Sequence, residues 1–306
     1  MLSVHGLRQR SALLQGIRSF FIGRGYIEVD TPVRLPVLIP EAHIKPFSCE
    51  GGYLHTSPEM CMKLLLARGC EQLFQLCHCF RKEEKGRLHV DEFTMLEWYH
   101  RDRDYTDLMI ECEELFYCLV QEAHGLAGVN RQGQLVIGQD LVSLTPPWER
   151  ISVAEAFGRY AGVSVAEALQ AGRFDQVLVE DVEPHLGWEA PVFLHDYPLA
   201  MASLSRAKKD NPELAERFEL YIGGIELANG FSELVDPVVQ RQRFEEEYEK
   251  MESKEAAPCM PELFLANLDQ ISAAAGIALG LDRLLMLLMG RESVQEVLPF
   301  SGDDLL

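Results

Sequence analysis

The chain has 306 residues, of which 47% are hydrophobic and 25% charged, values typical of a globular protein rather than a disordered or fibrous one. Its 48 acidic residues outnumber the 28 basic ones, so the formal net charge is −20. That charge disfavours passive binding to nucleic acid and attraction to anionic membranes. The most apolar stretch, 271–290, contains Asp282 and Arg283 and is therefore not expected to span a bilayer.

Apolar residues near the N-terminus predict the first amphipathic helix, because Leu14, Ile17 and Phe21 recur at helical spacing. Two strands around a polar loop of about a dozen residues follow further on, and a loop of that length is typical of a functional site. The predicted elements of the first third are a helix over 5–24, an extended segment over 26–32, a helix over 58–69 and strands over 72–80 and 93–99.

The rest of the chain also contains both predicted helices and predicted strands. Its charged run over 244–250 is interpreted as a solvated helix face. Hairpins, single strands and helices in this order predict an α+β fold with a mainly antiparallel sheet. We expect one domain over 1–306, with a helical insertion at about 130–190. Further predicted elements are a helix over 105–125, a hairpin near Gly133, helical stretches over 153–160 and 165–169, strands over 192–194, 219–222, 226–229 and 276–280, and a helix from Asp282.

Eight cysteines are scattered without the spacing of a disulfide framework, which predicts reduced thiols and a cytoplasmic location. The Cys77-His78-Cys79 triplet contains the residue types of a zinc site. No second ligand pair follows at zinc-finger spacing, so the sequence does not predict a metal there.

Three clusters carry residues suited to nucleotide chemistry. In the polar loop, Arg81 and His89 offer cationic groups for phosphates, and Phe93 offers a flat face for a base. A turn at Gly223-Gly224 brings Glu219 and Glu226 toward each other, and paired carboxylates suit Mg²⁺ bound to phosphates. The third cluster is the glycine-rich strand that precedes Arg283. Each cluster taken alone has a simpler explanation. The first also fits a charged surface loop, the second two surface glutamates, and the third ordinary packing of a helix on a sheet.

Together with the first helix, these clusters resemble the class II aminoacyl-tRNA synthetases, whose three signature motifs are matched here in order and spacing. The first helix with GYIEVDTP is similar to motif 1, FRKEE and HVDEFTMLEWY to motif 2, and GLDR to motif 3. TSPEMCMK and ELANGFSEL resemble the lysine-specific branch of class IIb. The resemblance extends from about residue 5 to 300, and it implies a sheet flanked by helices, use of ATP and Mg²⁺, and dimerisation through motif 1.

Two features of the chain differ from lysyl-tRNA synthetases and resemble the ligases that attach lysine to translation elongation factor P. Motif 1 begins almost at Met1, so no anticodon-binding domain is expected ahead of it. Ala278 replaces the middle glycine of the G-x-G-x-G-x-D-R pattern. This resemblance implies activation of (R)-β-lysine, or lysine, as an adenylate and its transfer to a lysine ε-amine on elongation factor P, with no tRNA and no membrane. The alternatives are a minimal lysyl-tRNA synthetase-like enzyme and a non-catalytic regulatory paralogue.

The resemblance also implies residue roles. Arg81 and Arg283 would act catalytically on the phosphates, and Glu219 and Glu226 would hold Mg²⁺. The carboxylates Glu59, Glu97 and Glu233 could pair with the two ammonium groups of the substrate, because a buried cation must be paired. The remaining ATP contacts would be Lys82, Glu83, His89, Val90, Phe93, Leu227 and Gly280, and the remaining substrate contacts Ser57, Pro58, Tyr99, Asn229, Phe231 and Ala278.

Overall fold

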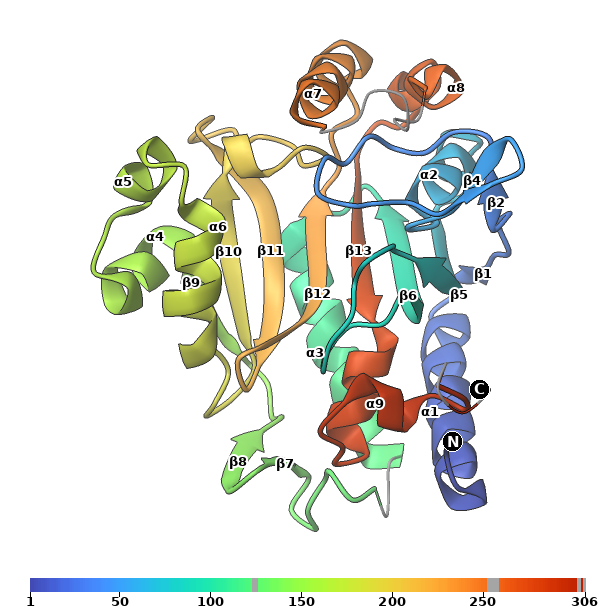
Figure 1. Cartoon of the computed structure of the whole chain (residues 1–306), viewed down its shortest axis with the longest axis vertical. Helices are drawn as coiled ribbons and strands as arrows, with labels where there is room; N and C mark the ends of the chain where they lie inside the picture. Colours follow the sequence, from blue (N-terminus) through green and yellow to red (C-terminus); the bar gives the residue numbers. More distant parts are fainter. Residues whose placement is uncertain (123–125, 252–258, 302–303, 305–306) are drawn as a thin grey trace.

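The computed structural model describes residues 1–122, 126–251, 259–301 and 304, and an eight-stranded sheet forms its centre (Figure 1). Neighbouring strands pair antiparallel except β1–β5 and β9–β10, which are parallel. The predicted α+β fold with a mainly antiparallel sheet is therefore confirmed. In sheet order the strands are β1 (Ile27–Glu28), β5 (Gln72–Phe80), β6 (Glu92–Arg101), β13 (Ala274–Gly280), β12 (Ile225–Ser232), β11 (Leu214–Ile222), β10 (Val192–Pro198) and β9 (Glu149–Ser152).

One face of the sheet forms the main hydrophobic core with three helices: α1 (Val4–Gly23), α3 (Tyr105–Glu122) and α9 (Leu281–Leu288). Alternate strand residues point to this face, as the two-residue period of a strand requires. Phe21 of α1 stacks on Phe74 of β5 with ring centroids 4.8 Å apart and also contacts Trp98 of β6 at 5.1 Å. These aromatic contacts fix α1 against β5 and β6.

The ends of the helices follow from local sequence. Ser3 caps α1 by accepting a hydrogen bond from the amide of Gly6. Asp236 caps α7 (Pro237–Lys250), with proline at the first helical position, where no amide donor is needed. The charged run 244–250 forms part of this helix, as predicted.

A second hydrophobic cluster lies toward the top of Figure 1, where α7 and α8 (Glu262–Leu265) lie. It joins α2 (Glu59–Ala67) to the large sheet and to a small one in the order β2 (Arg34–Leu35), β4 (Gly52–Leu54), β3 (Ser48–Cys49). Its buried members include Leu35, Met62, Tyr99, Phe244 and Phe264.

In the segment 134–185, a hairpin packs in the main core through Leu135 and Val142. The short helices that follow pack on β9 and β10 through a third cluster. The hairpin predicted near Gly133 is present as β7 and β8, which begin at Gln134 and turn at Gly138. Gly133 itself lies in the turn that precedes β7, between the bridged residues Val129 and Leu135. The elements are β7 (Gln134–Ile137), β8 (Asp140–Ser143), α4 (Val153–Ala156), α5 (Val165–Gln170), α6 (Phe174–Val177), π-helical turns Phe157–Ala161 and Leu178–Val182, and a 3₁₀ turn Glu183–His185. Other 3₁₀ turns are Leu199–Met201, Leu268–Gln270 and Val294–Val297.

The other predicted elements agree with the structure to within a few residues, with two exceptions. The extended segment predicted over 26–32 contributes only the two residues of β1 to the sheet. The end of the helix predicted over 105–125 lies outside the described residues, since α3 is described as far as Glu122. No helix in the described part of the chain has the length and apolar character needed to cross a membrane.

A buried polar network ties three separate elements together. Asp282, at the start of α9, accepts hydrogen bonds from the Arg10 guanidinium at 2.7 Å and from the Thr94 amide at 2.6 Å. Arg10 also donates to the Thr94 hydroxyl and to the carbonyl of Val297. Because every charged group here is paired, α1, β6 and α9 are held in a fixed relation next to Arg283.

Candidate active site

The second face of the sheet presents side chains from four adjacent strands in two parallel rows. Across β6, β13, β12 and β11, Glu97 pairs with Ala278, Ala278 with Asn229, and Asn229 with Glu219. The next row, two residues along each strand, runs Tyr99, Gly276, Phe231 and Arg217. Residues in one row share a face, so the register assembles a polar floor from segments far apart in sequence.

A β-bulge in β12 brings both Glu226 and Asn229 to this floor. Glu226 and Asn229 are three residues apart, so they would point to opposite faces of a regular strand. The pairing shifts by one residue between Leu220–Ala228 and Tyr221–Glu226, which leaves Leu227 without a partner on β11. The shift places Glu226 and Asn229 on one face.

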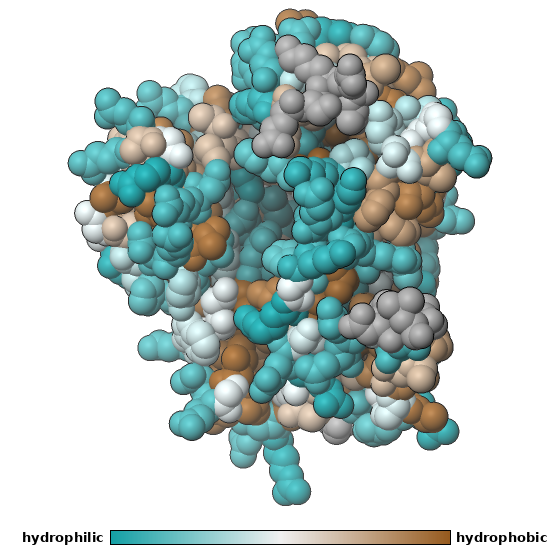
Figure 2. Space-filling view, viewed as in Figure 1, coloured by the Kyte–Doolittle hydropathy of each residue, from teal (hydrophilic) through white to brown (hydrophobic). Residues whose placement is uncertain are grey.

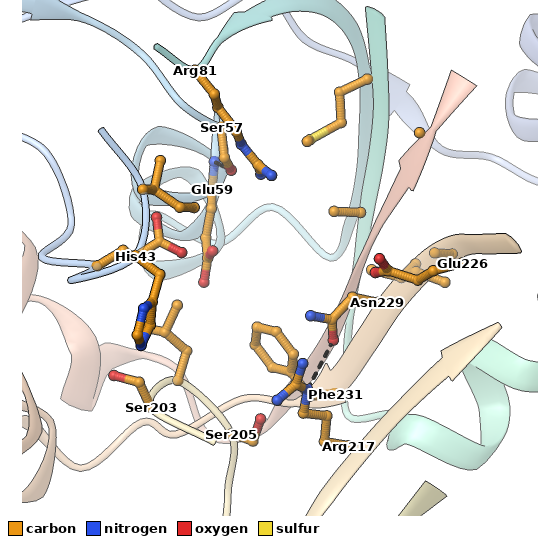
Figure 3. A pocket seen from close by; sticks show the side chains of 18 of the residues that line it. His43, Ser57, Glu59, Arg81, Ser203, Ser205, Arg217, Glu226, Asn229 and Phe231 are labelled. Atoms are coloured by element: carbon orange, nitrogen blue, oxygen red, sulfur yellow. Dashed lines mark hydrogen bonds between the residues drawn. The ribbon is translucent and has the colours of Figure 1, made fainter. Parts of the chain in front are cut away.

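All residues of these two rows except Glu219 line a pocket with a volume of about 850 Å³. Figure 2 shows the surface hollowed between the lobe of α4–α6 and the centre of the molecule, and Figure 3 shows Glu59, Arg81 and Glu226 around the same space. Fifteen residues of the predicted site line it: Ser57, Glu59, Arg81, His89, Val90, Phe93, Glu97, Tyr99, Glu226, Leu227, Asn229, Phe231, Ala278, Gly280 and Arg283.

One end of the pocket is cationic. Arg283 donates a hydrogen bond to the carbonyl of Glu226 at 2.7 Å and another to its carboxylate at 3.3 Å, and it contacts His89 Nε2 at 2.8 Å. Arg81 lies over the Phe93 ring, 5.2 Å from its centroid. Partial burial and the neighbouring Arg283 lower the pKa of His89, so its imidazole is neutral near pH 7 and free to accept or donate a hydrogen bond.

The opposite end is acidic. The carboxylate of Glu97 is 1% exposed and accepts hydrogen bonds from the Ser57 hydroxyl at 2.6 Å and the Tyr99 hydroxyl at 2.9 Å. Burial and the nearby Glu59 carboxylate raise the pKa of Glu97 well above its usual range. A cation placed beside Glu97 and Glu59 would relieve this repulsion.

Lys63, which sequence reasoning missed, lies beneath the acidic end. Its side chain is 1% exposed and its ammonium group forms ion pairs with Glu59 and Glu233. The two carboxylates raise the pKa of Lys63, against the effect of burial. Burial raises the pKa of Glu233 to about 8 even with Lys63 beside it. Lys63 is four residues after Glu59 in α2, but nothing in the sequence indicates its pairing with Glu233.

Five predicted site residues do not line the pocket: Pro58, Lys82, Glu83, Glu219 and Glu233. Glu83 has a positive φ of 71° and its exposed carboxylate pairs with Lys45, whereas the next residue, Glu84, lines the pocket. Glu233 pairs with Lys63 below the floor. Their roles toward ligands therefore stay predictions.

Glu219 lies behind Glu226 and is already well bonded. Its Oε1 accepts from Arg217 at 2.6 Å, and its Oε2 accepts from the hydroxyls of Tyr197 and Tyr221. Burial and the adjacent Glu219 carboxylate raise the pKa of Glu226. Two acidic groups this close favour the binding of a cation to the Glu226 carboxylate, on the side that faces the pocket.

The structure adds pocket residues for which no role is predicted from the sequence. Arg217 bridges Glu219 and Asn229, the latter at 3.2 Å, and its position two residues before Glu219 on one strand is the only signal for it (Figure 3). The charged run 244–250 of α7 is predicted to be a solvated helix face, yet Glu246, Glu247 and Lys250 line the pocket. Further lining residues are Glu41, His43, the segment 199–205, Gln242 and Arg243.

Comparison with known proteins agrees with this geometry. The family model described as tRNA synthetases class II (D, K and N) matches residues 3–304. The chain belongs to this family. The class II resemblance predicted from the sequence, with its fold, is thus confirmed.

Curated relatives within the family share one name. A Salmonella gallinarum protein named elongation factor P--(R)-β-lysine ligase is 39% identical, and the match covers 98% of this chain and 96% of the relative. Proteins of the same name from Edwardsiella ictaluri and Salmonella typhi are 38% and 37% identical with the same coverage. The resemblance to elongation factor P ligases is confirmed.

Proposed function

We propose that the chain is an ATP-dependent ligase that activates (R)-β-lysine as an adenylate and transfers it to the ε-amine of a lysine on elongation factor P. The observation that carries the proposal is one pocket with a cationic end suited to phosphates and an acidic end suited to ammonium groups. The names of the curated relatives support the acceptor and the amino acid.

The chain's own groups would act mainly by positioning and electrostatics. The substrate ammonium groups would bind Glu97 and Glu59, which directs the carboxylate along the floor toward Arg81. Arg81 would hold the α-phosphate and the attacking carboxylate together, and Arg283 with His89 would hold the outer phosphates. Attack of the carboxylate on the α-phosphorus releases pyrophosphate. The lysine ε-amine of the acceptor then attacks the adenylate carbonyl and displaces AMP.

Magnesium bound to ATP fits the acidic pair at the nucleotide end. The carboxylate of Glu226 lines the pocket, and the hard oxygens that it offers are the ligands that Mg²⁺ prefers. We propose that Glu226 holds the ion and that Glu219 supports it from behind. Bound Mg²⁺ would offset the negative charge of the phosphates.

A competition experiment tests the proposal. The purified chain, Mg-ATP and each lysine isomer are offered elongation factor P and bulk tRNA together. Intact mass of the factor and acid-precipitable label on tRNA are read in parallel. We expect a lysyl increment on the factor, faster with (R)-β-lysine, and none on tRNA. Label on tRNA with an unmodified factor would instead favour a minimal lysyl-tRNA synthetase, and no ATP–pyrophosphate exchange with any isomer would favour a non-catalytic role.

Binding of the amino acid should release a proton. Glu97 has a raised pKa in the free enzyme and must ionise to pair with an ammonium group. Affinity is therefore expected to rise with pH, by up to about tenfold per unit, as long as the pH lies below the raised pKa of Glu97. Calorimetry in two buffers of different ionisation enthalpy measures the released proton. Glu97→Gln should bind weakly and lose the dependence, and a wild-type affinity that stays flat with pH would contradict this reasoning.

The methyl group of Ala278 is expected to determine the choice between lysine isomers. It lies between Glu97 and Asn229 in the floor, so Ala278→Gly opens space for one methyl group beside the substrate. We expect the preference for (R)-β-lysine over α-lysine, measured as the ratio of kcat/KM in pyrophosphate exchange, to fall by about tenfold or more. Ala273→Gly, just ahead of the same strand and outside the pocket, is the control, and an unchanged ratio in Ala278→Gly would refute this role.

We further propose a cytoplasmic homodimer that contacts its partner through α1 and β1. Apolar side chains are exposed along these elements, among them Val4 at 67%, Ile22 at 56% and Ile27 at 54%. The eight unpaired cysteines are consistent with a reducing compartment. Sedimentation of the wild type against Ile22→Glu tests the interface, because a charge there should produce monomers.

A further inference from the structure

A cluster of one histidine and two cysteines lies behind the pocket wall. In the described part of the chain, one group of three potential metal ligands is found: His55, Cys77 and Cys79, with ligand atoms within 4.8 Å of one another. Cys77 and Cys79 are two residues apart in β5 and so share a face, with their sulfur atoms 3.9 Å apart. His55 comes from the segment between β4 and α2.

His78, the histidine within the triplet, does not belong to this cluster. It points to the other face of β5, where its exposed side chain contacts Glu92 at 2.8 Å. The third ligand type therefore comes from a residue distant in sequence, which is why spacing within the triplet gave no metal prediction.

The hydrogen bonding of His55 leaves one ring nitrogen free. His55 is fully buried, and its Nε2 lies 2.6 Å from the carbonyl oxygen of His78. A carbonyl oxygen only accepts, so Nε2 carries a proton, and in the neutral ring the free lone pair is on Nδ1. Nδ1 is buried and makes no hydrogen bond within the described residues. Metal-bound histidines are typically held in this way, with one nitrogen donating to a backbone carbonyl and the other bound to the metal.

We propose that His55, Cys77 and Cys79 bind Zn²⁺. Two thiolates at about 2.3 Å from a tetrahedral zinc ion lie about 3.8 Å apart, close to the separation observed here. Binding of Zn²⁺ to the two cysteines releases their thiol protons to solvent. Cys77 is the partly exposed member, which leaves its side of the ion open to a water molecule.

The ion would brace the wall of the active site. Ser57 and Glu59 follow His55 in the chain, while Cys77 and Cys79 pair with Met95 and Phe93, both of which line the pocket. Zinc would thus join the segment that carries the amino-acid contacts to the strands that carry the nucleotide contacts. This inference does not depend on which amino acid or acceptor the enzyme uses.

Cobalt titration of the full-length chain, stripped of metal and kept reduced, tests the site. We expect one equivalent of Co²⁺ to give a thiolate-to-cobalt charge-transfer band with the strong visible bands of four-coordinate cobalt, and Zn²⁺ to displace it. Cys77→Ser and His55→Gln should each weaken binding by at least about tenfold. Cys61→Ser, at a partly buried cysteine outside the cluster, should bind as the wild type does.

Two results would overturn the proposal. One is the absence of the charge-transfer band from the reduced wild type. A disulfide between Cys77 and Cys79 after oxidation would not count in favour of the metal site. The other is unchanged cobalt affinity in Cys77→Ser, a conservative change at the most exposed member, with a thermal midpoint equal to that of the wild type.

Discussion

Replacing Lys63 by methionine is expected to lower the free energy of unfolding by about 3–5 kcal/mol, because it leaves Glu59 and Glu233 without their shared cation in a buried site. The loss should grow with pH. Without Lys63 these carboxylates fold most easily as neutral acids, and the unfolded chain gives up their protons above about pH 4 to 5. Urea denaturation at pH 6 and pH 8 measures both effects.

Two further variants separate charge from packing at Lys63. Lys85→Met removes a lysine whose side chain is 78% exposed, and it should change stability by less than about 0.5 kcal/mol. Adding Glu233→Gln to Lys63→Met removes one of the stranded carboxylates and should recover part of the loss. If Lys63→Met is as stable as the wild type at pH 8, the ion pairs at the pocket floor do not support the fold.

Arg81→Ala is expected to reduce the rate of ATP–pyrophosphate exchange by about 10²–10³-fold, or about 3–4 kcal/mol of transition-state stabilisation. The reason is that Arg81 would contact the charge that develops between the carboxylate and the α-phosphate. Its other contacts are few: a hydrogen bond of 3.4 Å to the Thr56 carbonyl, a 3.9 Å ion pair with Glu84 and the Phe93 ring. The fold should therefore tolerate the change.

Kinetic controls distinguish this role from a general loss of charge. Arg81→Lys keeps the charge but loses the planar fork, so it should recover only a small part of the rate. Arg131→Ala, at an exposed position outside the pocket, should leave exchange unchanged. A loss confined to KM for ATP, with kcat intact, would mean that Arg81 binds the ground state only.

The elements of this fold could be predicted because each has a local cause. The helix periodicity of Leu14 and Ile17, the glycine turn at 223–224 and the long loop before Phe93 all depend on neighbouring residues. The joining of Glu219 and Glu226 across that turn could be predicted for the same reason. The fifteen predicted residues that line the pocket could be named because they lie in short motifs, not because their contacts could be derived.

The remaining features depend on contacts between distant segments. A buried lysine contradicts the ordinary preference of lysine for solvent, and its partner Glu233 lies on another element. The exposed contact of Glu83 with Lys45 depends on the path of the loop. His55 joins Cys77 and Cys79 only because the segment before α2 packs against β5, as the hydrogen bond from Phe80 to the carbonyl of His55 shows.

The bulge at Leu227 makes the length of this segment as important as its composition. Every side chain of β12 after the bulge owes its face to one unpaired residue. Inserting a single residue between Glu226 and Asn229, with the bulge kept at Leu227, would turn Asn229 and Phe231 into the apolar core and bring Ala228 and Gly230 to the floor. Specificity can therefore be engineered here by substitution, whereas a change in length would exchange the binding surface for the core.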